Sequence, residues 1–180
     1  MKPIALKKIL LRIFLFSSLL SFAQRPEKIY SITRLLKDNA YYQSQAKLWH
    51  QEIEKNKKNA DAWLNYYRAS RYMQITSGQD SAGSSKRFEK LNNIVSLMAQ
   101  NIPNTFEYNY IKWANGSNDL SLFPYLEKAY ELAPDRSETY PDLTSSYELK
   151  GDVVKRDFFA QKWYDSGETS AGILNYNYNV

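Results

Sequence analysis

The chain has 180 residues, enough for one domain with a sizeable core, and it contains no cysteine and a single histidine. The absence of cysteine excludes disulfides, a cysteine nucleophile and the lipid anchor that lipoproteins carry on a cysteine. The formal net charge of +5 comes largely from four basic residues among the first 24, which include no acid. The remainder has 20 basic and 19 acidic residues, a near-neutral balance that argues against a nucleic-acid partner.

Residues 1–23 have the pattern of a secretory signal peptide. A basic start precedes an apolar stretch at 9–20, and small residues follow at Ser21 and Ala23. The stretch falls short of the roughly 20 apolar residues that cross a bilayer. We therefore expect cleavage after Ala23 and no membrane insertion of the mature chain, with an uncleaved anchor as the alternative. The Phe-Ala-Gln sequence at 22–24 resembles leaders of Bacteroidota, which implies a periplasmic or secreted protein, not a lipoprotein.

The mature chain has the periodicity of helices. Its apolar residues recur every three to four positions, and alternation with period two is not sustained. We predict an all-α domain over 24–167 with about eight helices, and we assign 168–180 to a tail or to the start of a truncated further domain. Turn and cap residues mark the expected helix ends at 38–39, 56–59, 77–85, 103–104, 115–119, 134–135, 151–152 and 166–167.

A period of 34 residues relates large residues along the chain. Tyr140 follows Phe106 by 34 positions, and Trp63 follows Ile29 by the same number. The spacing from Trp63 to Phe106 is 43, nine more than the period, and the segment 77–85 is nine residues of mostly small polar types. A polar insertion at 77–85 therefore restores the phase of the repeat.

The unit that begins at Pro103 resembles a tetratricopeptide repeat. Phe106 takes the large position that opens helix A, Trp113 takes the aromatic position seven residues later, and the run YLEKAYELAPD at 125–135 is similar to the end of helix B. The chain thus resembles a degenerate tetratricopeptide array of about 3.5 to 4 antiparallel helix pairs, an α-α superhelix; a plain helical bundle is the alternative. The resemblance implies a module that binds other molecules without catalysis.

A polar stripe in the second unit is the candidate binding site. Asp61, Asn65, Arg68 and Tyr72 are spaced by four, three and four residues, so they share one helix face. The resemblance implies that such helix A residues line an inner groove, where an arginine and an asparagine amide can hold a peptide carboxylate. We predict a protein or peptide partner in the envelope, and we expect Arg68→Ala to weaken binding with little effect on stability. An exposed polar face without a ligand is the alternative.

No catalytic residue, metal ligand or cofactor is predicted. His50 lies at the edge of the apolar face formed by Ala46, Trp49 and Ile53, and no second histidine exists to complete a metal site. We expect Trp63, Trp113, Tyr140 and Tyr147 to be core residues between helices. The alternative function is a glycan-binding or enzyme-associated accessory domain of a longer exported protein, with a sugar stacked on exposed tryptophan.

Overall fold

The computed structural model describes residues 25–30, 36–77, 84–116 and 119–167, and of 84–87 only the backbone. These residues form seven α-helices and two short 3-10 helices, with no strand among them, so the predicted all-α class is confirmed. The predicted signal peptide and C-terminal tail lie outside the described residues. Within the described part of the chain, no helix is long and apolar enough to cross a bilayer.

The helices end close to the predicted breaks. Of the segment 77–85 that was predicted as a polar insertion, 78–83 lie outside the described residues, and 84–85 form the start of α4. In chain order the helices are α2 (Asn39–Lys55), α3 (Ala60–Thr76), α4 (Ser84–Asn101), α5 (Phe106–Ala114), η2 (Leu120–Leu122), α6 (Phe123–Leu132), η3 (Ser137–Thr139), α7 (Tyr140–Leu149) and α8 (Val153–Asp165).

Capping residues explain where several helices begin. The side chains of Asp38, Asn59, Thr105 and Asp152 each accept a backbone N–H from the first turn of α2, α3, α5 and α8, respectively. Between α7 and α8, Gly151 has a φ of +72°, a left-handed conformation that glycine adopts without strain.

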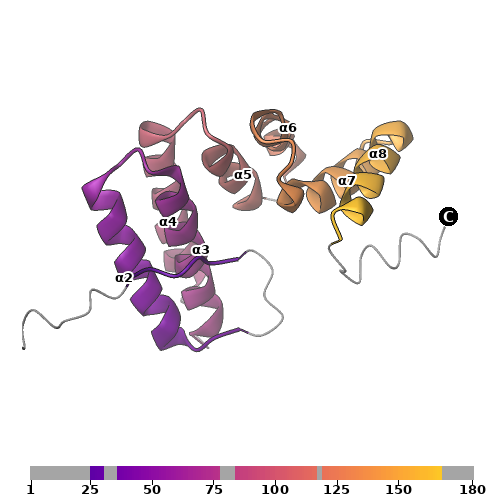
Figure 1. The fold of residues 1–180 in the computed structure, drawn as a ribbon. Coiled ribbons are helices and arrows are strands. Elements are labelled where there is room, and N and C mark those ends of the chain that lie inside the picture. The colour runs from indigo at the N-terminus through magenta and orange to yellow at the C-terminus, as the bar shows by residue number, and fades with distance from the viewer. Residues whose placement is uncertain (1–24, 31–35, 78–83, 117–118, 168–180) are drawn as a thin grey trace, which may run out of the picture.

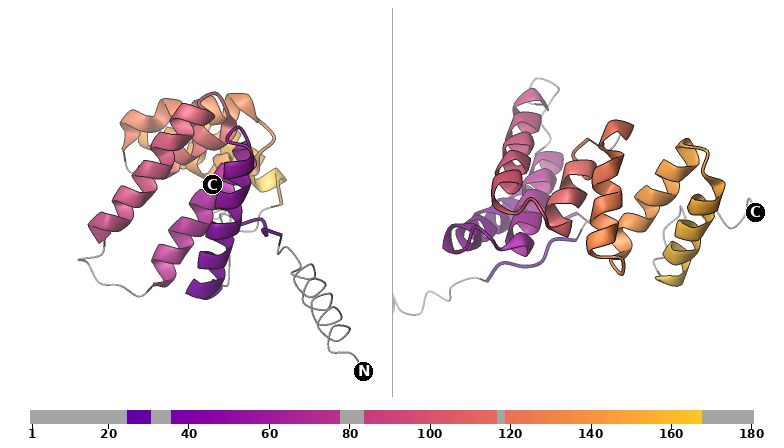
Figure 2. Two further views of the ribbon diagram at one scale, coloured as in Figure 1. Left: turned by 90° about the vertical axis from the view of Figure 1, so that its left-hand side faces the viewer. Right: turned by 90° about the horizontal axis from the view of Figure 1, so that it is seen from above.

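The helices pack mainly as consecutive pairs. α2 lies against α3, α5 against α6, and α7 against α8 (Figure 1). α4 packs less extensively, on both α3 and α5. Seen from above, the helices follow one another from α2 to α8 in a row (Figure 2). This arrangement brings α3, α5 and α7 to one shared surface, which carries the cavity described below.

One hydrophobic core runs through the described residues. Trp63, Trp113, Tyr140 and Tyr147 are each less than one-tenth exposed, so their predicted place in the core is confirmed. Phe123 of α6 makes edge-to-face contacts with both Trp113 of α5 and Tyr147 of α7. Aromatic packing therefore joins the successive helix pairs.

The first unit is described only in part, because 31–35, within the helix expected from Ile29 onward, lie outside the described residues, which begin with 25–30. Residues 25–30 have no helical hydrogen-bonding pattern and run as an extended segment, here called the N-terminal segment. The polar backbone of the segment is bound by side chains instead of by a helical turn. The segment crosses α2 and α3 (Figure 1).

Candidate functional site

The N-terminal segment is held on α2 through the backbone of Glu27. Its N–H donates to Oε1 of Gln45 at 2.7 Å, and its carbonyl accepts from Nε1 of Trp49 at 2.8 Å. The hydroxyl of Tyr41 donates to the Glu27 carboxylate at 2.9 Å. Burial is the larger cause, and together with the hydrogen bond and charge of Glu27 it raises the pKa of Tyr41 to about 12. Both main-chain groups of Glu27 are thus bound by side chains one turn apart on α2.

Two residues further on, α3 holds Ile29 in the same way. The Ile29 N–H donates to Oδ1 of Asn65 at 2.6 Å, and Nη1 of Arg68 donates to the Ile29 carbonyl at 3.1 Å. The Ile29 side chain is only 3% exposed. Residues 27 and 29 lie on the same side of an extended chain, so two helices grip alternate residues of one segment.

The structure places the four predicted site residues in different environments. Asn65 and Arg68 are buried and bind Ile29, whereas Asp61 is exposed and accepts both hydrogen bonds from the Asn65 amide nitrogen. Tyr72 is partly buried, and its ring stacks on Tyr42 at a centroid distance of 5.2 Å. The stripe is therefore largely covered, and the burial and partners of Arg68 argue that its removal would lower stability, against the expectation of little effect.

Arg68 also begins a chain of ion pairs. Its Nη2 lies 3.2 Å from Oε1 of Glu138, which lies 2.6 Å from Nη2 of Arg136. Arg136 pairs in turn with Glu107 at 2.7 Å and places its guanidinium 3.7 Å from the centroid of the Phe106 ring. Burial alone would raise the pKa of Glu138, but the hydrogen bonds and charges of Arg136 and Arg68 together outweigh it and lower that pKa.

Beside Arg68 lies a cavity of about 280 Å³ between α3, α5 and α7. Arg68, Arg71 and Tyr72 line it from α3, Tyr110 and Ala114 from α5, and Asp142 from α7. Arg71 is exposed, so its guanidinium is an accessible cation at this surface. A cavity with aromatic walls and charged groups suits a peptide side chain or terminus better than an apolar ligand.

Two acidic groups in the cavity wall are shifted toward their neutral forms. Burial raises the pKa of Asp142, although a hydrogen bond from Trp113 Nε1 at 3.2 Å and the charge of Arg71 act in the opposite direction. Burial also raises the pKa of Tyr110, and the nearby Asp142 adds to this shift. The negative charge of Asp142 is therefore less favourable here than on an open surface.

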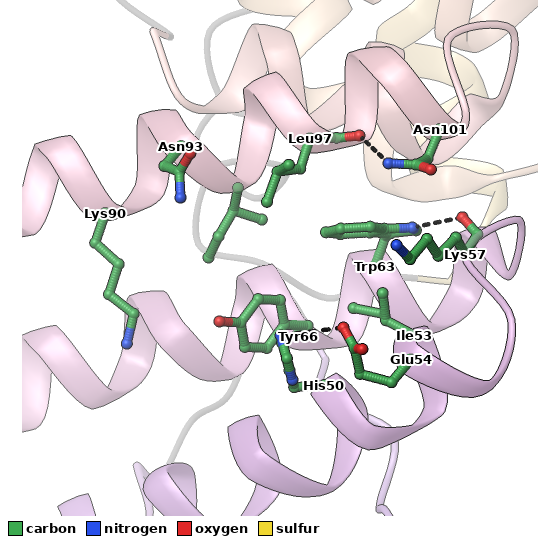
Figure 3. A pocket seen from close by; sticks show the side chains of 11 residues that line it. His50, Ile53, Glu54, Lys57, Trp63, Tyr66, Lys90, Asn93, Leu97 and Asn101 are labelled. Atoms are coloured by element: carbon green, nitrogen blue, oxygen red, sulfur yellow. Dashed lines mark hydrogen bonds and ion pairs between the residues drawn. The ribbon is translucent and has the colours of Figure 1, made fainter.

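A second pocket of about 250 Å³ lies between α2, α3 and α4, and Figure 3 shows its lining. Trp63 donates through Nε1 to the Lys57 carbonyl at 2.9 Å, and the half-exposed His50 lies 3.8 Å from Glu54. The His50 ring packs edge-on against Tyr66 at 5.3 Å. Among the described residues, no group of three or more His, Cys, Asp or Glu side chains could hold a metal ion.

Sequence reasoning missed Gln45, Trp49 and Glu27 as parts of a binding arrangement. Gln45 falls on the apolar face of its helix and is 1% exposed. A buried amide must find hydrogen-bond partners, so a glutamine at a core position was the signal that a main-chain segment lies against it. Glu138 carried no comparable signal, because its partner Arg68 is 70 residues away.

No family model matches the chain, and a search of curated proteins finds no significant match.

Proposed function

We propose that this protein is a non-catalytic module of the bacterial cell envelope that binds an extended peptide or a protein surface. The observation that carries the proposal is the grip on the N-terminal segment: four polar side chains of α2 and α3 bind the backbones of two alternate residues. Side chains arranged in this way recognise an extended main chain with little regard to most of its side chains.

The helix pairs support a degenerate tetratricopeptide-like array as the scaffold. The α5–α6 and α7–α8 pairs coincide with the units of the 34-residue period that contain Phe106 and Tyr140. Two features keep the array degenerate: residues 25–30 run as an extended segment across α2 and α3, and α4 packs less extensively on α3 than α2 does. The export of the protein rests on the leader-like residues 1–23 alone.

The peptide-binding function is favoured over glycan binding by the tryptophans. Trp49, Trp63 and Trp113 are less than one-tenth exposed, and Trp163 is partly buried against the core. Sugar stacking needs an exposed aromatic face, which these tryptophans do not provide. The α3–α5–α7 surface instead has a cavity lined by charged side chains.

Capture from envelope extract tests the proposal. The tagged full-length chain and two alanine variants are used as baits: Arg71→Ala, which removes the exposed cation of the α3–α5–α7 cavity, and Lys128→Ala, an exposed position on α6 outside it. We expect a discrete partner that wild type and Lys128→Ala retain and that Arg71→Ala loses. Equal recovery with all three baits would show that the cavity does not bind the partner. Fractionation of cells that express the chain with its leader tests the location.

A further inference from the structure

The face of α2 and α3 under the N-terminal segment is built as a receptor for a main chain. Gln45, Trp49, Asn65 and Arg68 are each less than one-tenth exposed, and each directs a polar atom at the segment. Burying such groups without partners is costly, so their positions are useful only with an extended chain in place. The Asn65 amide is also fixed from behind, because its nitrogen donates to Asp61.

Of the four side chains from Glu27 to Tyr30, the receptor face contacts two, and the other two are exposed. Ile29 is buried, and the Glu27 carboxylate accepts the hydrogen bond from Tyr41. Lys28 and Tyr30 are exposed, the latter by 61% of its surface. The chemistry that fits is therefore an extended peptide with an acid at one position and a β-branched aliphatic residue two positions later.

The segment also lies next to the α3–α5–α7 cavity. From Glu27 on α2 to Ile29 on α3 it approaches Arg68, which lines the 280 Å³ cavity beside α5 and α7. Arg68 thus belongs both to the receptor face and to the lining of this cavity, which also includes Arg71. A longer segment of another protein could therefore make contacts in the cavity in addition to those of Glu27 and Ile29.

We propose that the α2–α3 face is a binding site for an extended acid-x-(Ile or Val) segment of a partner protein, and that residues 25–30 are its built-in occupant, which the partner segment displaces. The inference rests on the proposed binding function and names its ligand class. A tethered occupant competes at an effective concentration on the order of millimolar, so it sets a threshold that weak peptides do not overcome.

A peptide supplied in trans tests this on the full chain. The probe is a fluorescent peptide with the sequence of residues 24–31, QRPEKIYS, with a matched peptide that has Asn in place of Ile. In the protein, Ile29→Asn weakens the occupant and leaves the receptor intact. We expect the probe to bind this variant at least about tenfold more tightly than wild type, because the tethered competitor is lost. The Asn peptide should bind neither wild type nor Ile29→Asn. The control variant Tyr30→Asn, which changes an exposed residue, should bind the probe as weakly as wild type does.

The receptor side is tested by Gln45→Met in the Ile29→Asn background, which removes the acceptor for the Glu27 N–H and keeps the side-chain volume. Loss of one such hydrogen bond should weaken probe binding about fivefold. If Ile29→Asn does not fold, Glu27→Ala replaces it, because it removes only the hydrogen bond from Tyr41 to the occupant. The probe should bind this variant more tightly than wild type, by a smaller factor. Probe binding that is no tighter to either occupant variant than to wild type overturns the inference. In that event a partner lost by Arg71→Ala would still place binding in the α3–α5–α7 cavity.

Discussion

Arg68 and Glu138 lie 70 positions apart in the sequence and form an ion pair with 3.2 Å between Nη2 and Oε1. The Arg68 side chain is 6% exposed, and its other terminal nitrogen holds the Ile29 carbonyl. One guanidinium therefore ties the N-terminal segment and α3 to the start of the last helix pair.

Arg68→Ala should lower the free energy of unfolding by about 2 kcal/mol or more, because removing one member of a buried pair leaves the other groups without partners. Glu138 keeps Arg136, which limits the loss. Lys128→Ala, at an exposed position on α6 whose ion pair with Glu131 is also exposed, should change stability by less than about 0.5 kcal/mol. Urea unfolding followed by circular dichroism measures both, and equal stabilities for the two variants would contradict this role for Arg68.

Glu138 should contribute stability that depends on pH. Its pKa in the folded state is below the usual 4.5, so the contribution is complete above the unfolded-state pKa and is lost as pH falls through the folded-state pKa. Glu138→Gln should destabilise the protein by about 1–2 kcal/mol at pH 7. Unfolding curves for the variant and wild type should converge as the pH falls below about 4.5. A difference that stays constant down to the acid transition would argue against an ionic role.

Asp142 should behave in the opposite sense. Because burial raises its folded-state pKa above the usual 3.8, its charge opposes folding at neutral pH, and protonation relieves the penalty as pH falls through that raised pKa. Asp142→Asn keeps an acceptor for Trp113 and removes the charge. We expect the variant to be more stable than wild type at pH 7 and the gain to disappear in acid. Thermal unfolding at several pH values measures it, and a loss of stability at pH 7 would mean that pairing with Arg71 dominates.

The sequence predicted the helices and their ends well, because caps, prolines and glycines act locally. Asn59 and Gly151, for example, mark their boundaries whatever the rest of the chain does. The site was predicted less well. Asn65 and Arg68 were chosen by their spacing on one helix face, but spacing does not reveal what covers that face, and the covering residue, Ile29, lies 36 positions from Asn65. Ile29 was placed in the first unit by its spacing of 34 residues from Trp63, and that spacing does not reveal that α3 binds its backbone.

The attachment of the N-terminal segment can be followed through single amides. The N–H groups of Glu27 and Ile29 donate to Gln45 and Asn65, so both should exchange slowly with deuterium although they lie in an extended segment near one end of the described chain. Asn65→Ala removes the acceptor for Ile29. We expect Ile29 to exchange at least about fivefold faster in this variant, the factor for one lost hydrogen bond. Because the segment is gripped as a unit, the Glu27 amide, whose own acceptor is unchanged, should exchange faster as well, while the amides of α7 and α8 keep their rates. If only the Ile29 amide exchanges faster, the contacts of Glu27 with α2 and of Ile29 with α3 act independently. A peptide could then displace the Ile29 contacts while those of Glu27 stay in place.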